Sequence, residues 1–393
     1  MNSSLTNLPS KNSIHISAFD TVRGLAAFSV VFSHYFTAYG APTRSGLWKQ
    51  VWSYTPLHIV WDGFAAVSLF YVLSGLVLSL KYFRDTPSPN LSGFKFSEFF
   101  TGRVFRIWTP YLAVFLLSYA LRRWIGFYEG ATVPPVSHSL FSTWNAAIPF
   151  TRLVSEGLLL QSGDFFLVPQ GWTLPIELAI SFFVPVGILL ASRNTGWLIF
   201  FTVLLIGPLG ATSYIFHFAA GILLAKYYSQ IRDWLGPRRG WKVSALLLGL
   251  ILYTFRFTLP VYFRWELSPS IPWLVTGAGS ALLLMVVIAS ESARSFLSIS
   301  WLKFIGRVSY SIYLVHFMAL IILVPRLFEL LHFPNRFALV AWWIGLFVLS
   351  AATLGLAALS YRWVEAPSMA FGKSLPGRIA AWRARRGQPA SGK

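Results

Sequence analysis

Apolar stretches long enough to cross a membrane recur along the whole sequence. A helix needs about 20 apolar residues to span the hydrocarbon core of a bilayer. Ten stretches near this length are centred near Val30, Leu73, Phe115, Phe182, Leu204, Gly221, Leu248, Leu284, Leu320 and Phe347. Only 11% of the 393 residues are charged, whereas soluble domains carry about a quarter. The sequence therefore predicts an all-α polytopic membrane protein with about ten transmembrane helices.

The fifth and sixth stretches are separated only by the turn-like sequence Gly207-Pro208-Leu209-Gly210. Glycine and proline interrupt helices. A pair broken in this way can cross the membrane twice or form a re-entrant element. The sequence is compatible with both arrangements.

Lysine and arginine residues are distributed unevenly between the two sides of the predicted bundle. With ten spans and a cytoplasmic N-terminus, 23 of the 32 basic residues fall on the cytoplasmic side and 9 fall outside. Short cytoplasmic loops retain such an excess, so we expect both termini in the cytoplasm. The net charge of +19 then reflects topology and contact with membrane lipids rather than binding of nucleic acid.

The predicted transmembrane domain, residues 19–366, contains one long loop and is flanked by two terminal segments. Residues 1–18 form a polar cytoplasmic segment without the features of a removable signal peptide. Residues 124–171 form an extracytoplasmic loop, with an amphipathic segment near Leu153 to Leu160, that serves as a lid, as an acceptor-binding loop or as a packed connector. Residues 367–393 are expected to form a disordered basic cytoplasmic tail near anionic lipid.

The sequence contains no cysteine, which excludes disulfides, thiolate-bound zinc and a cysteine nucleophile. We expect no metal site and no permanently bound cofactor. The chemistry is therefore expected from ionisable residues in the apolar stretches, which are costly in lipid and become candidate functional residues.

The first apolar stretch carries three such residues. Asp20 and Arg23 lie at its cytoplasmic edge, and His34 follows eleven residues after Arg23. At 1.5 Å per residue this separation is roughly 16 Å, about half the hydrocarbon thickness. We therefore expect His34 near the middle of the membrane, as a catalytic or a packing residue.

Other ionisable residues occur at the ends of later stretches. Glu177 lies near the outer end of the fourth, where its carboxylate needs a partner. Arg103 and Arg106 share one helical face and suit either an anionic ligand or positive-inside anchoring. His316 enters the ninth stretch from the inner side.

Taken in order, the motifs resemble those of the integral-membrane acyltransferase-3 family of bacterial O-acyltransferases. The motifs that carry the resemblance are Phe19 to Ala27 continuing to His34, Leu69-Phe70-Tyr71-Val72-Leu73-Ser74-Gly75, Arg103 to Tyr111, Trp172 to Glu177, Gly306 to His316, and Val364-Glu365-Ala366-Pro367. Two positions depart from the family pattern. Ser68 replaces an acidic residue found in many members, and Thr173 replaces the usual Ser.

The resemblance implies an acyltransferase of the bacterial inner membrane that moves an acyl group, expected to be acetyl, from cytoplasmic acyl-coenzyme A to a hydroxyl of an acceptor. The acceptor is expected to be a glycan, a lipid-linked glycan or a glycolipid. His34 is the expected general base, and Glu177 orients its imidazole or contacts the acceptor. Arg23, Arg103 and Arg106 are expected to bind the coenzyme A phosphates. Possible supporting residues are Asp20, Ser74, Trp172, Tyr313 and His316.

Several alternatives stay open at the level of sequence. The acyl group could pass directly to the acceptor or first onto His34. Ser74, Tyr313 and Trp172 are all chemically suited to donate to an oxyanion. A proton-coupled transporter of a polar or anionic small molecule would also place histidines and carboxylates in the membrane, although no internal repeat is evident.

Overall fold

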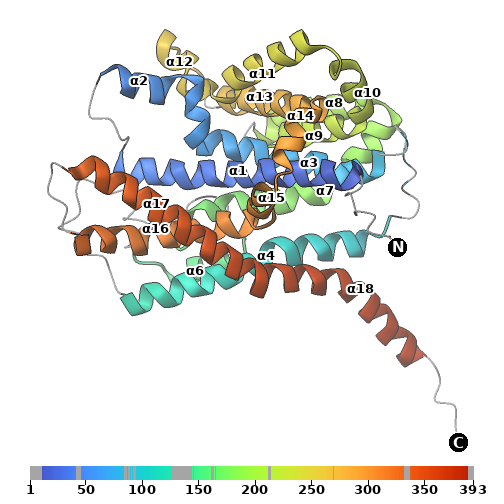
Figure 1. Cartoon of the computed structure of the whole chain (residues 1–393). Coiled ribbons are helices and arrows are strands. Elements are labelled where there is room, and N and C mark those ends of the chain that lie inside the picture. Colours follow the sequence, from blue (N-terminus) through green and yellow to red (C-terminus); the bar gives the residue numbers. More distant parts are fainter. Residues whose placement is uncertain are drawn as a thin grey trace, which may run out of the picture. The chain divides into compact units, whose positions relative to one another are not determined.

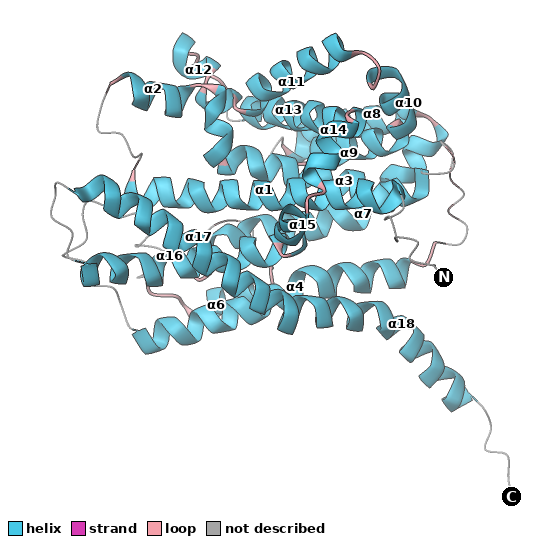
Figure 2. Cartoon of the chain, viewed as in Figure 1, coloured by secondary structure: helices cyan, strands magenta, loops and turns pink. Residues whose placement is uncertain are grey.

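The computed structural model describes residues 11–40, 46–83, 86, 89, 91, 94–125, 144, 146–160, 163, 165–210, 214–268, 270–331 and 337–387. Across these residues the regular structure is helical, without strands, as the sequence predicts (Figure 2). Of the segments predicted from sequence, residues 1–10, residues 388–393 and, within the long loop, residues 126–143, 145, 161, 162 and 164 lie outside the described residues.

The helices, labelled in Figure 1, belong to two compact units, each of which is described by itself. The first unit comprises residues 1–36, 41–89 and 184–310, and the second comprises residues 37–40, 90–183 and 311–393. Helices of the first unit are α1 (Lys11–Tyr39, which ends in the second unit), α2 (Leu47–Tyr54), η1 (Pro56–Trp61), α3 (Gly63–Phe83), α8 (Thr195–Leu209), α9 (Ile215–Lys226), α10 (Tyr228–Leu235), α11 (Arg239–Tyr253), η4 (Phe255–Phe257), α12 (Leu259–Phe263), α13 (Ser270–Ala289), α14 (Glu291–Leu297) and α15 (Ser300–Arg307). Helices of the second unit are α4 (Phe96–Ile125), α6 (Phe150–Gly157), η2 (Pro169–Trp172), α7 (Thr173–Arg193, which ends in the first unit), α16 (Ser309–Leu331), α17 (Ala338–Ser360), the π-helix η6 (Tyr361–Glu365) and α18 (Ala366–Gly387).

Six helical segments of the described chain are long and apolar enough to cross a bilayer. They are Gly63–Phe83, Phe96–Ile125, Pro169–Arg193, Ser270–Ala289, Ser309–Leu331 and Ala338–Ile379. A bent pair, Arg239–Tyr253 with Phe255–Val261, would make seven if it forms one span. Asp20, Arg23 and His34 lower the hydropathy of α1, which is not among the six. The chain is thus a multi-pass membrane protein, and ten crossings stay a prediction.

The doubtful fifth and sixth stretches form two separate short helices, α8 and α9. Gly210, with a φ of 75°, ends α8, and Tyr214, with a φ of 57°, precedes α9. Their 15 and 12 residues correspond to about 22 and 18 Å, shorter than the ~30 Å hydrocarbon core. Both helices are apolar enough to lie in the membrane, but neither has the length of an upright span.

Glycines let α3 and α9 approach each other closely in the first unit. A Cβ atom on Gly221 would lie 2.1 Å from the Val72 carbonyl oxygen, and one on Gly75 would lie 2.3 Å from that of Phe218. Small residues favour such close packing between membrane helices. Gly75 is the last residue of the second sequence motif. Its close contact with the α9 backbone explains why this position has no side chain.

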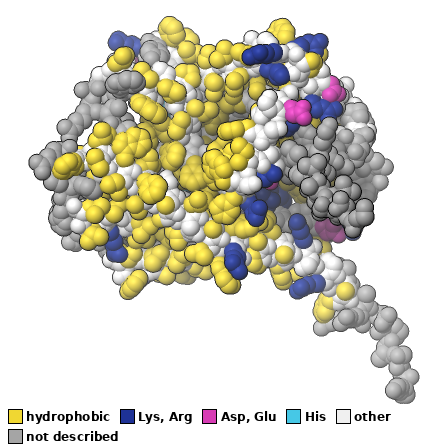
Figure 3. Space-filling view, viewed as in Figure 1, with side chains coloured by type: hydrophobic (Ala, Val, Ile, Leu, Met, Phe, Trp, Pro, Cys, Tyr) yellow, Lys and Arg dark blue, Asp and Glu magenta, His cyan; other side chains and the backbone are white. Residues whose placement is uncertain are grey.

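Large apolar side chains are exposed along several helices. Phe200 on α8, Leu247 on α11 and Phe347 on α17 are exposed by 54%, 56% and 73%. The face drawn in Figure 3 is largely covered by apolar side chains. Hydrocarbon, rather than water, is the solvent that such a surface fits.

The expectation of a disordered tail at residues 367–393 is wrong for residues 367–387, which belong to the helix α18. The first half of α18 packs on α4. Ser368 Oγ donates to the Phe105 carbonyl at 2.5 Å, and the Phe371 and Phe105 rings meet edge to face at 5.1 Å. Gly372 lies against the same Phe105 side chain. Apolar residues interleaved with the basic ones provide this contact.

A buried carboxylate begins α3. Asp62 is 1% exposed, and its Oδ1 accepts from the Ala65 backbone N–H at 2.8 Å. Burial raises the pKa of Asp62 to about 7, although this N–H group and the Arg256 guanidinium lower it. Burial likewise lowers the pKa of nearby His58, on η1, to about 4.

Candidate active site

The Trp172–Glu177 motif spans the junction between η2 and α7. Pro169 begins η2, where its missing N–H costs no hydrogen bond. The Thr173 hydroxyl donates to the Gln170 carbonyl at 3.2 Å and so ties the start of α7 to η2. Glu177 then lies one turn into α7, with its side chain 21% exposed.

Glu177 pairs with Arg103 of the arginine motif. Arg103 Nη2 lies 2.9 Å from Glu177 Oε1, and the Arg103 side chain is 8% exposed. Two ionised groups in a membrane span are far less costly as a pair than apart. The expectation that Glu177 needs a partner is thereby confirmed. Arg106, one turn further along α4, is half-buried.

Tyr313 of α16 contacts the same junction. Its hydroxyl donates to the Gln170 carbonyl and lies 2.7 Å from both that oxygen and Thr173 Oγ1. A tyrosine hydroxyl has a single proton. In this arrangement Tyr313 holds η2 and α7 against α16, and that proton is not directed at an oxyanion.

His316 lies one turn after Tyr313 and is fully buried. Its Nδ1 is 2.8 Å from the Tyr313 carbonyl oxygen. Because a carbonyl can only accept, Nδ1 carries the proton, and in the neutral imidazole Nε2 carries the lone pair. The ring orientation is therefore fixed by its own helix.

The closing Glu-x-Pro motif contacts α16 as well. Glu365 lies in the π-helical turn between α17 and α18 and is 2% exposed. Ser311 Oγ donates to Glu365 Oε2 at 2.7 Å. Turns of π-helix inside longer helices frequently mark functional positions. Four of the six motifs thus meet in the second unit.

Glu156 supports this site from the long loop, and the sequence analysis missed it. Its fully buried carboxylate accepts the backbone N–H groups of Phe166, Leu167 and Val168 at 3.1, 2.9 and 3.3 Å. Burial raises the pKa of Glu156, while these three N–H groups act against the rise. The available sequence signal was a lone Glu in the apolar run Leu153 to Leu160.

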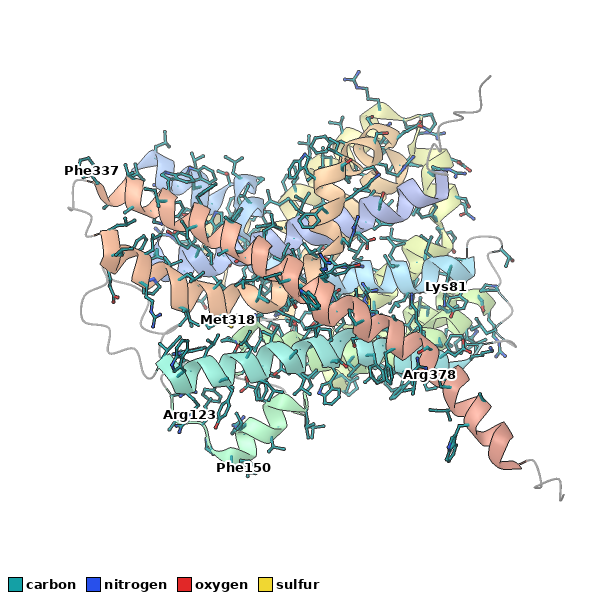
Figure 4. All side chains as sticks on the ribbon, turned by 60° about the horizontal axis from the view of Figure 1, so that its bottom comes forward. Lys81, Arg123, Phe150, Met318, Phe337 and Arg378 are labelled. Atoms are coloured by element: carbon teal, nitrogen blue, oxygen red, sulfur yellow. The ribbon has the colours of Figure 1, made fainter. Side chains whose placement is uncertain are left out.

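The helix that carries Glu156 confirms the predicted amphipathic segment, at Phe150–Gly157. Figure 4 shows this helix, α6, running beside α4 from the labelled Phe150. Trp108 Nε1 donates to the Gly157 carbonyl at 3.0 Å, and the Tyr111 hydroxyl donates to the Glu156 carbonyl at 2.9 Å. The loop is thus fixed to α4 at positions five and eight residues after Arg103.

The remaining predicted residues lie in the first unit. Arg23 Nη1 pairs with Asp20 Oδ1 at 2.9 Å on α1. His34 is half-buried further along the same helix. Ser74 is buried on α3. Within the described chain, no group of three or more acidic or histidine side chains is placed to hold a metal ion.

Close backbone contact fixes α15 beside the start of α1. A Cβ atom on Gly306 would lie 2.5 Å from the Asp20 carbonyl carbon, and one on Gly24 would lie 2.8 Å from Gly306 N. Gly306 opens the fifth motif and Asp20 belongs to the first. These two motifs are in direct contact beside Arg23.

A family model described as an acyltransferase domain, acyltransferase family 3, matches residues 16–362. The chain belongs to the acyltransferase-3 family. The match covers every motif up to His316 and ends just before the closing Glu-x-Pro. No curated protein and no solved structure gave a match. Family membership identifies this multi-pass membrane protein as an acyltransferase. Its Arg103–Glu177 ion pair joins two helices that are long and apolar enough to span a bilayer.

Proposed function

We propose that this protein is an O-acyltransferase of the bacterial inner membrane that transfers an acyl group, acetyl in the simplest case, from cytoplasmic acyl-coenzyme A to a hydroxyl of a glycan or lipid-linked glycan. The observation that carries the proposal is the Arg103–Glu177 pair, which joins two motif-bearing helices. One turn before Glu177 on α7, Thr173 contacts Tyr313 and Gln170. Family membership supports the reaction class.

The transfer itself needs a base, a donor site and a leaving group. His34 removes the proton of the acceptor hydroxyl as its oxygen attacks the thioester carbonyl. The C–O bond forms, the carbonyl becomes a tetrahedral oxyanion, and its collapse breaks the C–S bond. Coenzyme A leaves as a thiolate and takes the proton from the His34 imidazolium. Atoms and charges therefore balance without a further reactant.

We assign three arginine side chains to binding of the acyl donor, acyl-coenzyme A. Guanidinium groups bind phosphates through paired N–H donors, and Arg23, Arg103 and Arg106 are expected to hold those of coenzyme A. Glu177 keeps Arg103 in position through the 2.9 Å ion pair. A second task for Glu177, contact with the acceptor, is compatible with its partly exposed carboxylate.

The test is thiol release from acetyl-coenzyme A by purified protein in nanodiscs, with octyl β-glucoside as a membrane-soluble acceptor. Arg103→Ala is expected to weaken binding of acetyl-coenzyme A at least tenfold. His34→Ala is expected to abolish turnover while binding persists. Matched controls are Arg232→Ala, which removes an exposed arginine of α10, and His217→Gln, which replaces a buried histidine outside the proposed machinery.

Two outcomes would contradict the proposal. If neither acetyl- nor succinyl-coenzyme A binds or turns over, the donor site is wrong and transport assays become the next step. If His34→Ala and His217→Gln lose turnover to the same extent, His34 is not the base.

A further inference from the structure

Gln170 is a buried residue whose side-chain orientation is determined by chemistry. It lies in η2, two residues before Trp172, and is 3% exposed. Its Nε2 donates to the Tyr313 and Leu314 carbonyl oxygens, both at 2.9 Å. Because these oxygens can only accept, the NH₂ end of the amide must face them. The carbonyl end, Oε1, therefore points elsewhere.

The main chain of Gln170 is held equally firmly. Its carbonyl oxygen accepts from the Tyr313 hydroxyl at 2.7 Å and from Thr173 Oγ1 at 3.2 Å. Side chain and backbone are both fixed to α16, so the amide has little freedom left to lose when a ligand binds. Such preorganisation is typical of groups that recognise substrate.

The side-chain oxygen of Gln170 makes no hydrogen bond of this kind. Gln170 Oε1 is buried and has no hydrogen-bond partner among the described residues. An unpartnered acceptor in a protein interior costs free energy, which a ligand donor recovers on binding. The same residue contacts Tyr313 and also Thr173, which lies one turn before Glu177 on α7.

We propose that Gln170 Oε1 accepts a hydrogen bond from an O–H or N–H group of the substrate, which makes Gln170 a specificity-determining residue for acyl transfer. The inference rests on the proposed function. Two sources offer this donor chemistry: the hydroxyl groups of the glycan acceptor and the amide N–H groups of the pantetheine arm. The two substrates are varied separately in the test.

The experiment compares wild type, Gln170→Met and Gln170→Lys in nanodiscs with acetyl-coenzyme A and octyl β-glucoside. Gln170→Met removes Oε1 at similar volume, and with it the Nε2 donor to the Tyr313 and Leu314 carbonyls. It is expected to raise one KM about five- to tenfold, the value of one hydrogen bond lost to the substrate, with kcat changed less than threefold. A rise confined to octyl β-glucoside identifies the acceptor hydroxyl, and a rise confined to acetyl-coenzyme A identifies the pantetheine amide. Gln230→Met, at an exposed glutamine of α10, is the matched control.

Gln170→Lys keeps a donor facing the two carbonyls but has no acceptor, so it serves if the Met variant does not fold. It is expected to raise the same KM at least as much. Two results would overturn the inference and show that Gln170 is structural. In the first, a folded variant has both KM values within twofold of those of an active wild type. In the second, a variant loses kcat and thermal stability without a change in either KM. A wild type that neither binds nor turns over acetyl-coenzyme A would instead contradict the proposed function, and this inference with it.

Discussion

Arg103 and Glu177 depend on each other because each would otherwise place a charge inside a helix that crosses the membrane. Their 2.9 Å contact links α4 to α7, two helices that lie 74 residues apart in sequence at these positions. The sequence motifs contain both residues, but spacing alone cannot reveal which charge meets which across such a separation. The pairing is a tertiary property of the second unit.

Glu177→Gln is expected to destabilise the protein because it leaves Arg103 buried without its counter-charge. The expected loss is about 1–3 kcal/mol, below that of a fully buried pair, because the Glu177 side chain is 21% exposed. Thermal unfolding of the purified protein measures it. Adding Arg103→Met should recover part of the loss. Asp233→Asn, which breaks the exposed Arg232–Asp233 pair, should leave the midpoint unchanged, and an equal shift in both variants would contradict the argument.

Asp62 is expected to make stability depend on pH. Its folded pKa of about 7 lies above the ordinary value of 3.8, so its contribution is complete below about pH 4 and is lost as the pH rises through 7. Asp62→Asn keeps an acceptor oxygen for Ala65 N–H and cannot ionise. We therefore expect the variant to be more stable than wild type at pH 8, by up to about 4 kcal/mol, and no more stable at pH 4. The same difference in stability between Asp62→Asn and wild type at pH 4 and at pH 8 would contradict this.

At the level of elements, the sequence predicted helices and their apolar cores well and their ends poorly. Apolar runs predicted α3, α4, α7, α13, α16 and α17 because membrane helices need a continuous apolar length. The tail prediction failed because Arg and Gly content suggested disorder, whereas Ser368 and Phe371 give α18 a contact surface on α4. Tertiary packing outweighed composition there.

Within the site, the sequence identified the charged motif residues but missed Gln170 and Glu156. Ionisable residues in apolar stretches are conspicuous because they are costly there. Gln170 carries no charge and precedes its motif by two residues, and its importance lies in hydrogen bonds to residues 313 and 314. Glu156 matters through three N–H groups ten to twelve residues away. The spacing of residues along the sequence does not reveal either set of hydrogen bonds.

The contact between α15 and α1 predicts that Gly306→Ala destabilises the first unit. An added Cβ would lie 2.5 Å from the Asp20 carbonyl carbon, so the helices must separate. Overpacking of this kind costs about 1–3 kcal/mol, and Arg23 should shift with its helix. The matched control is Gly355→Ala on α17, where nothing lies within 4 Å of the added atom. Thermal unfolding and acetyl-coenzyme A binding are measured together. Equal effects of the two substitutions would contradict the packing argument.

For the whole molecule, the prediction of ten crossings includes α8 and α9, which are shorter than the bilayer core is thick. Two short helices can each cross if they tilt little and the bilayer thins locally, or they can enter and return on one side. Both arrangements preserve the sides of all other loops, since the pair adds either two crossings or none. The excess of Lys and Arg on one side therefore cannot distinguish ten crossings from eight.

Single cysteines can distinguish them because the natural sequence has none. With ten crossings, Leu209→Cys, exposed at the end of α8, should react with an impermeant maleimide in intact spheroplasts, as should Gln50→Cys on the expected outer side. Gln230→Cys should react only after permeabilisation. If Leu209→Cys behaves like Gln230→Cys, α8 and α9 form a re-entrant pair, and the predicted ten crossings are reduced by two. If Gln50→Cys is inaccessible from outside and Gln230→Cys reacts there, the orientation inferred from the basic residues is inverted, and the proposal of a cytoplasmic acyl donor fails with it.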